Sequence, residues 1–140
     1  MSNQITTKIS ASRFGKTKLR IIAGVVRVSK QHFKDSWKKQ GWVDTRLEKW
    51  KERQKLTKQD RRTKKRRSIL VQSGNLRRGF KVTSRSFDKI TIINELPYAE
   101  THNNGDTKRN IPQRKFMGES KALDRKVRRE ILKHLNDLFK

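Results

Sequence analysis

Apolar residues recur at steps of three and four in two stretches of the chain, one near its beginning and one at its end. The first stretch, residues 14–37, contains Leu19, Ile21, Ile22, Val25, Val26, Val28 and Phe33. The second starts near Ser120 and contains Leu123, Val127, Ile131, Leu132, Leu135 and Leu138. This spacing gathers apolar side chains on one face of a helix. The sequence therefore predicts two amphipathic helices, with Gly24 inside the first and Gly41 ending it as a turn.

Between these helices the pattern changes to two short runs of alternating residues. The runs are marked by Phe80, Val82 and Thr83 and by Ile90, Ile92 and Ile93. They predict strands near 80–84 and 90–94, and the connection from Ser84 to Lys89 is short enough for a hairpin. The structure expected from these elements is α+β: a small antiparallel sheet packed with a long N-terminal helix and a C-terminal helix.

The segment between the strands and the last helix carries turn signals. Pro97 favours a helical turn that begins near Tyr98. Residues 103–106, Asn-Asn-Gly-Asp, indicate a loop. Residues 111–116 are predicted to form a further edge strand, because a sheet tolerates Pro112 only at its edge.

Residues 51–67, called the basic arm below, have a different composition from the rest. Leu56 is their one aliphatic residue, and Glu52 and Asp60 are their only acidic ones. Such a segment cannot bury itself and is expected to be a solvated loop or arm. Trp42 and Trp50 precede it and are expected to anchor its base. Its ten basic residues are Lys51, Arg53, Lys55, Lys58, Arg61, Arg62, Lys64, Lys65, Arg66 and Arg67.

The length and composition of the chain predict a single domain, residues 1–140, with a small core. Only 31% of the residues are hydrophobic, which favours burial completed by partners. The net charge is +25, and a field of that size attracts nucleic acid or an acidic protein surface. From charge alone nucleic acid is the favoured partner, with the arm neutralising phosphates and Trp42 and Trp50 stacking on bases.

No residue pattern in the chain completes a catalytic or cofactor site. Gly15-Lys16-Thr17 lacks the earlier glycine of a phosphate-binding loop. His102, with Glu100 and Asp106, has no second histidine nearby for a metal, and a local backbone contact is the simpler role. His32 and His134 are isolated on predicted helices. We therefore expect no enzymatic activity, no cofactor and no metal.

Cysteine is absent and no stretch approaches the roughly 20 apolar residues of a membrane span. Residues 1–7 lack the apolar core of a signal peptide. The chain is expected to be soluble, to be made in the cytoplasm and to contact no membrane.

Three punctuated segments follow one another in the second half of the chain. They carry Ser73, Gly74 and Leu76, then Tyr98, Ala99, His102 and Gly105, then Pro112, Phe116 and Gly118. In their order and spacing, residues 37–140 resemble the phage virion morphogenesis (tail completion) family of Mu-like and other tailed phages. Gly79 departs from it, because many members have a small hydroxyl residue there, and the charge is higher than the family would suggest.

The resemblance implies a structural virion protein made in the host and located at the head-to-tail junction. Several copies, six being the expected number, would form a ring that caps the tail tube and joins it to the head connector, as a tail completion, neck or tail terminator protein. The basic arm, Arg77, Arg78 and Arg114 are the interface candidates, since a guanidinium pairs well with carboxylate or backbone oxygens. Leu76, Tyr98 and Phe116 are expected to pack in the core.

A basic nucleic-acid-binding protein, ribosomal or nucleoid-like, is the alternative. In that case the basic arm alone would bind, and the three segments would need no particular residues. Contact with DNA is also open under the first hypothesis.

Overall fold

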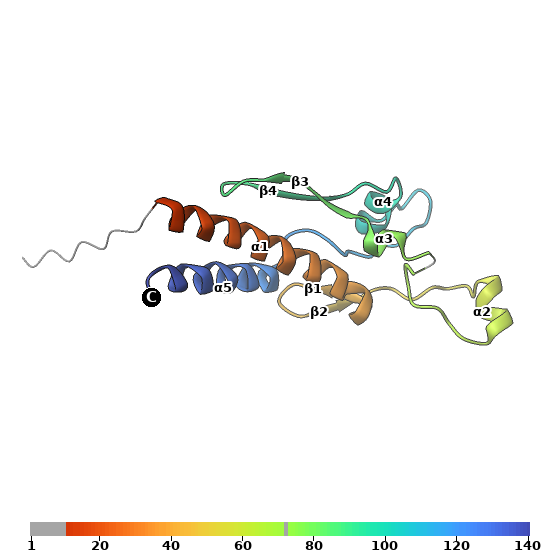
Figure 1. The fold of residues 1–140 in the computed structure, drawn as a ribbon. Coiled ribbons are helices and arrows are strands. Elements are labelled where there is room, and N and C mark those ends of the chain that lie inside the picture. The colour runs from red at the N-terminus through yellow and green to blue at the C-terminus, as the bar shows by residue number, and fades with distance from the viewer. Residues whose placement is uncertain (1–10, 72) are drawn as a thin grey trace, which may run out of the picture.

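The computed structural model describes residues 11–71 and 73–140. Figure 1 shows α1 running through the middle of the molecule, with β3 and β4 on one side of it and α5 on the other. The arm that contains α2 projects at the end opposite the start of α1 and the C-terminus. In chain order the elements are α1 (Ala11–Lys39), β1 (Gly41–Val43), β2 (Leu47–Lys49), α2 (Lys58–Thr63), α3 (Asn75–Arg78), β3 (Phe80–Arg85), β4 (Ile90–Asn94), α4 (Ala99–Asn104) and α5 (Lys121–Leu138).

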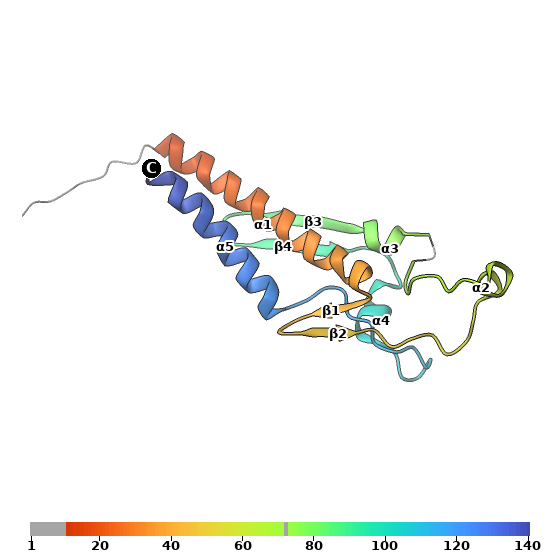
Figure 2. The same cartoon turned by 90° about the horizontal axis from the view of Figure 1, so that it is seen from below.

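The predicted α+β class and both long helices are confirmed. Figures 1 and 2 show α5 lying antiparallel along the N-terminal half of α1. Gly24 lies against α5, where a Cβ atom would lie 2.5 Å from Glu130 Oε1. Glu130 in turn accepts a hydrogen bond from Arg27 Nη2 at 2.9 Å. The glycine that weakens the helical pattern of the sequence therefore leaves room for the Glu130 side chain of α5.

The predicted hairpin at 80–94 is also confirmed. β3 and β4 pair antiparallel, with Phe80 opposite Asn94 and a register shift between Val82 and Ser84. Ser86 N donates to Lys89 O at 2.9 Å and closes the turn. Along β3 the burial alternates from Phe80, which is buried against α1, to the exposed Arg85 at the far end.

A second hairpin, β1 with β2, was not predicted from the sequence. The turn expected at Gly41 lies one residue earlier, at Gln40, whose φ is +52°. Gly41 is instead the first residue of β1 and pairs with Lys49. A Cβ atom at Gly41 would lie 2.6 Å from Glu48 O, so the close pairing of the strands requires glycine there.

This second hairpin also positions the start of α5. The Ser120 hydroxyl donates to Val43 O at 2.7 Å and accepts from Leu123 N at 3.1 Å as the helix cap. Asp44 Oδ1 accepts from Lys121 N at 2.7 Å. The first turn of α5 is thereby attached to the β1–β2 connection.

The edge strand predicted for residues 111–116 is wrong. Ile111 makes only an isolated bridge with Asp106. The rest of the segment is held by side chains and loop carbonyls instead of a strand. Asn103 Oδ1 accepts from Phe116 N at 2.9 Å and from Met117 N at 3.1 Å. A segment that contains a proline can satisfy its backbone in this way without joining a sheet.

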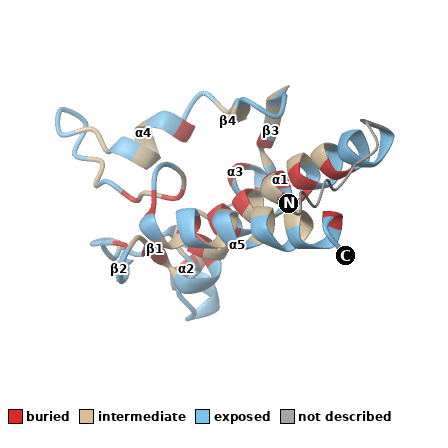
Figure 3. Cartoon of the chain, turned by 90° about the vertical axis from the view of Figure 1, so that its left-hand side faces the viewer, coloured by how far each residue is buried: buried red, intermediate tan, exposed pale blue. Residues whose placement is uncertain are grey.

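The core lies where the C-terminal half of α1 meets the segments that follow it. Trp37 is its centre, with its ring centroid 4.9 Å from that of Phe116 and 5.7 Å from that of Trp50. Figure 3 shows buried positions along α1 and at the start of β3 and of α4. Among residues 11–71 and 73–140, no helix has both the length and the apolar character that crossing a membrane requires. The buried cluster consists of Phe33, Trp37, Trp42, Trp50, Leu76, Phe80, Ala99, Phe116 and Leu123.

Candidate interaction surface

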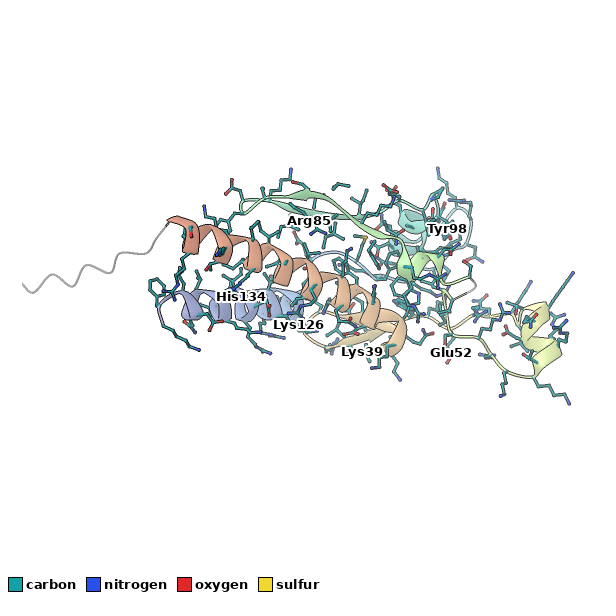
Figure 4. All side chains as sticks on the ribbon, in the orientation of Figure 1. Lys39, Glu52, Arg85, Tyr98, Lys126 and His134 are labelled. Atoms are coloured by element: carbon teal, nitrogen blue, oxygen red, sulfur yellow. The ribbon has the colours of Figure 1, made fainter. Side chains whose placement is uncertain are left out.

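The basic arm stands away from the body of the molecule. All of its basic residues except Arg53 are exposed, and Figure 4 shows the side chains around α2 pointing into solvent. The solvated arm predicted from the sequence is confirmed in this respect. It is nevertheless more organised than a free loop, because it contains the helix α2.

Asp60 organises the arm from within. Its carboxylate accepts hydrogen bonds from Thr57 Oγ1 at 2.7 Å, Thr57 N at 2.9 Å and Arg67 N at 2.9 Å. Arg53 Nη1 lies 3.5 Å from Asp60 Oδ2, and Arg53 Nη2 donates to Arg67 O. One carboxylate therefore ties the beginning, the helix and the end of the arm together, and we call this set of contacts the Asp60 clasp.

The clasp lowers the pKa of Asp60 to about 2 from its ordinary 3.8, first through the Thr57 hydroxyl and then through the amides of Arg67 and Thr57. Because the pKa is lowered, the ionised carboxylate stabilises the clasp fully when the pH is above the ordinary pKa of 3.8. This stabilisation is lost as the pH falls through about 2. The arm should therefore keep its order at neutral and mildly acidic pH.

Asp60→Asn should release the arm without unfolding the body. The backbone amide of Arg67 should exchange its hydrogen markedly faster. An asparagine side chain is neutral and has only one acceptor oxygen, so it cannot replace all the hydrogen bonds that the Asp60 carboxylate accepts. Hydrogen exchange followed by NMR measures this directly, with Glu52→Gln, which removes only the exposed pair with Arg66, as the control. Equal exchange in the wild type and Asp60→Asn would contradict the clasp.

The base of the arm is fixed to the core as the sequence predicted. Trp42 and Trp50 are 2% and 6% exposed, and Trp50 Nε1 donates to Lys115 O at 2.7 Å. Two buried tryptophans are not available to stack on nucleic acid bases, so the structure contradicts that part of the alternative.

Arg114 joins the base of the arm from the opposite side. Its Nε and Nη2 donate to Lys51 O at 3.0 and 2.8 Å, and the residue is only 7% exposed. The backbone-oxygen contact expected of this guanidinium is thus made within the chain. Burial, and then the nearby Arg53, lower the pKa of Arg114. Within the described part of the chain, no carboxylate forms an ion pair with Arg114.

The three segments that carried the resemblance meet in this region. Leu76, Ala99 and Phe116 are buried in the shared core, as the sequence predicted for Leu76 and Phe116. Gly105 ends α4 at a φ of +79°, and a Cβ atom there would lie 2.8 Å from Gln113 N. The segments are therefore fold determinants that converge in space. Gly74, at a φ of +77°, immediately precedes α3, while Ser73, Pro112 and Gly118 lie in the connecting segments.

Tyr98 corrects the prediction that all three large residues of these segments are core. It is 42% exposed, and its ring meets the edge of the His102 ring at a centroid distance of 6.1 Å. Arg77 and Arg78 are also exposed, and Arg78 Nη2 donates to Ser73 O at 3.0 Å. This leaves an aromatic ring at the surface beside the core.

The titratable residues of α4 and its loop do not form a metal site. Asp106 Oδ2 lies 2.7 Å from Arg109 Nε, which lowers the pKa of that carboxyl, and Glu100 is exposed. The main-chain carbonyl of His102 accepts a hydrogen bond from Arg114 N at 2.9 Å, which is not the local contact expected of the His102 side chain. Its Nδ1 is buried without a hydrogen-bond partner. Over the described ranges no group of three or more His, Asp or Glu residues could hold a metal.

His32 has a structural position between three elements. Its Nε2 lies 3.2 Å from Val43 O, and its Nδ1 lies 3.1 Å from Lys126 Nζ on α5. Burial, followed by the charge of Lys126, lowers the pKa of His32. A neutral ring can donate at Nε2 and accept from the ammonium at Nδ1, so His32 joins α1, β1 and α5. His134 likewise contacts Glu130, at 3.1 Å, on its own helix.

A groove of about 860 Å³ runs between the arm and the segments that meet at its base, and we call it the arm-base groove. On the arm side it is lined by Arg53, Lys58 and Arg67, and on the body side by Leu70, Tyr98 and Arg114. None of the described residues that line it is acidic. It thus combines an apolar floor with a cationic rim.

The roles of two residues in this region, Asp60 and Asn103, are not predicted from the sequence. Asp60 is one of the two acidic residues of the basic arm, and Thr57-Lys58-Gln59-Asp60 has the spacing of a helix capping box. Asn103 was assigned to a loop, and nothing in the sequence indicates that its side chain holds Phe116 and Met117 thirteen and fourteen residues later.

Comparison with known proteins gives one family. The model of the phage virion morphogenesis family matches residues 17–136. The match confirms the resemblance inferred from residues 37–140 and extends it into α1. No curated protein and no solved structure matches the chain.

Proposed function

The chain belongs to the phage virion morphogenesis family, and we propose that it acts at the head-to-tail junction as a tail completion, neck or tail terminator protein. Family membership supports a structural role in virion assembly. In our proposal several copies, six by the expectation from the family, form a ring that caps the tail tube and joins it to the head connector. The protein acts by assembly and not by catalysis.

The main structural observation that supports ring formation is the β3–β4 sheet. It has only two strands, and neither outer edge is paired with another strand in the described chain. An unpaired edge presents backbone donors and acceptors to a neighbour, and two strands alone are marginally stable. In such a ring, one edge or helix of each copy would contact a different surface of the next copy. The copies form a closed ring when the rotation between neighbours divides a full turn evenly.

Charge then determines where the ring forms. Each copy carries a net charge of +25, so copies in free solution repel one another, most strongly at low ionic strength. An acidic tail or connector surface would offset this repulsion. Assembly on the tail end is therefore favoured over assembly in solution.

Nucleic-acid binding remains the second candidate because of the exposed cations of the arm. The three converging segments argue against it as the main function, since they build a specific core and groove that polyanion binding does not need. In our proposal, contact with DNA passing through the junction is an accessory property of the arm.

The experiment that tests the proposal is electron microscopy of particles made by a phage that lacks this protein. Heads and tails should accumulate unjoined, or tails should have abnormal lengths. Normal infectious particles would overturn it.

A further inference from the structure

The arm-base groove contains a buried cation without a counter-ion. Arg114 is 7% exposed and is held by two hydrogen bonds to Lys51 O. The described residues supply it with no carboxylate. Burying a guanidinium is unfavourable unless an anion or several acceptors compensate the charge. The site is therefore electrostatically incomplete in the single chain.

The floor of the groove contains apolar residues whose backbone is hydrogen-bonded to α1 and to the turn after it. Leu70 has a φ of +58°, which is unusual for a side chain of this kind. Trp37 Nε1 donates to Leu70 O at 3.1 Å, and Gln40 Oε1 accepts from Ile69 N at 2.6 Å. These bonds from α1 and the turn after it maintain the strained backbone. Strain kept in place by the core is typical of binding sites.

We propose that the arm-base groove binds an extended segment of an acidic virion protein, with a carboxylate at Arg114 and apolar side chains on Leu70 and Tyr98. This inference rests on the proposed function and names the chemistry of one partner. A carboxylate pairs with a guanidinium in a planar, two-bond geometry. An aromatic ring at the mouth, as Tyr98 is here, is a frequent anchor at interfaces.

Two other occupants fit less well. A second copy of this chain has 38 basic and 13 acidic residues, so it would bring mainly like charge to the cationic rim. DNA would satisfy the rim cations and leave the apolar floor exposed to water. An acidic segment with alternating aliphatic residues matches both features.

Fluorescence anisotropy with two synthetic peptides of equal charge tests the proposal. One peptide alternates glutamate with leucine and the other alternates glutamate with serine. At physiological ionic strength the full-length protein should bind the leucine peptide about tenfold more tightly, because only that peptide uses the floor.

Variants at exposed positions locate the binding without disturbing the core. Tyr98→Ala should weaken binding of the leucine peptide about tenfold. Lys58→Gln should weaken it more than Lys65→Gln, which removes the same charge from an arm position outside the groove. Arg114→Gln should weaken binding of both peptides, but it also removes a contact with Lys51 O, so the surface variants decide.

The contrary results are distinct. Equal affinity for both peptides, or equal losses from Lys58→Gln and Lys65→Gln, would show general charge attraction and overturn the proposal. If single-stranded DNA or a second copy of the chain, and not the leucine peptide, occupied the groove at Tyr98, the proposal would also be overturned. If the Tyr98→Ala protein still caps tails normally, the assignment of the groove is wrong and the proposed ring is unaffected. If the groove binds the peptide but the protein never caps tails, the proposed function fails.

Discussion

Phe116→Ala should lower the free energy of unfolding by about 3–5 kcal/mol, the usual cost of removing a buried aromatic ring. Phe116 is 0% exposed, and its ring contacts both Trp37 and Phe80, at centroid distances of 4.9 and 6.1 Å. It joins α1, β3 and the segment before α5. Because a domain of this size has a total stability of about 5–15 kcal/mol, much of the fold depends on this one residue.

Urea denaturation followed by tryptophan fluorescence measures this change. Phe139→Ala is the matched control, because that phenylalanine is 66% exposed and should cost less than about 1 kcal/mol. A loss of less than about 1 kcal/mol for Phe116→Ala would mean that the three converging segments do not share one core.

The second large effect concerns the basic arm. Replacing six of its exposed cations by glutamine should leave the free energy of unfolding nearly unchanged and weaken attachment to tails by at least about tenfold. The arm contributes little to the core, whereas its charges act on the partner through screened electrostatics. The positions are Lys55, Lys58, Arg61, Arg62, Lys64 and Lys65, which spares the Asp60 clasp.

A charge-matched variant separates position from net charge. It carries glutamine at six exposed cations of α5 and the C-terminus, namely Lys121, Arg125, Arg128, Arg129, Lys133 and Lys140. Attachment, measured by co-sedimentation with tails over a range of salt concentrations, should fall far less in this variant. Equal losses in both would assign attachment to overall charge, and unfolding of the arm variant would make the arm part of the core.

Periodicity predicted the elements that bury one regular face. The strand pattern of residues 80–94 and the stripe of α5 were recognisable because each side chain that faces the core recurs at a fixed interval. The β1–β2 hairpin has strands of three residues, too short for a repeat to appear. Trp42, within β1, and Trp50, just after β2, indicated burial but not the strands.

The site was predictable in composition but not in geometry. The sequence indicates a solvated arm and identifies Arg114 as an interface candidate. It does not reveal that Arg114 reaches Lys51 O across 63 residues or that Leu70 and Tyr98 complete a groove with it. Such contacts depend on long-range packing around Trp37, which no local pattern encodes. The exposure of Tyr98 has the same origin, because α4 presents Ala99 to the core and leaves Tyr98 outside.

Electron microscopy of tails from a phage lacking the protein, before and after the purified chain is added back, tests the central claim most directly. We expect bare tail ends to acquire a ring of density, with added heads then joining and infectivity returning. Bare tail ends that stay unchanged, with the protein bound instead to bulk DNA or ribosomes, would contradict the account.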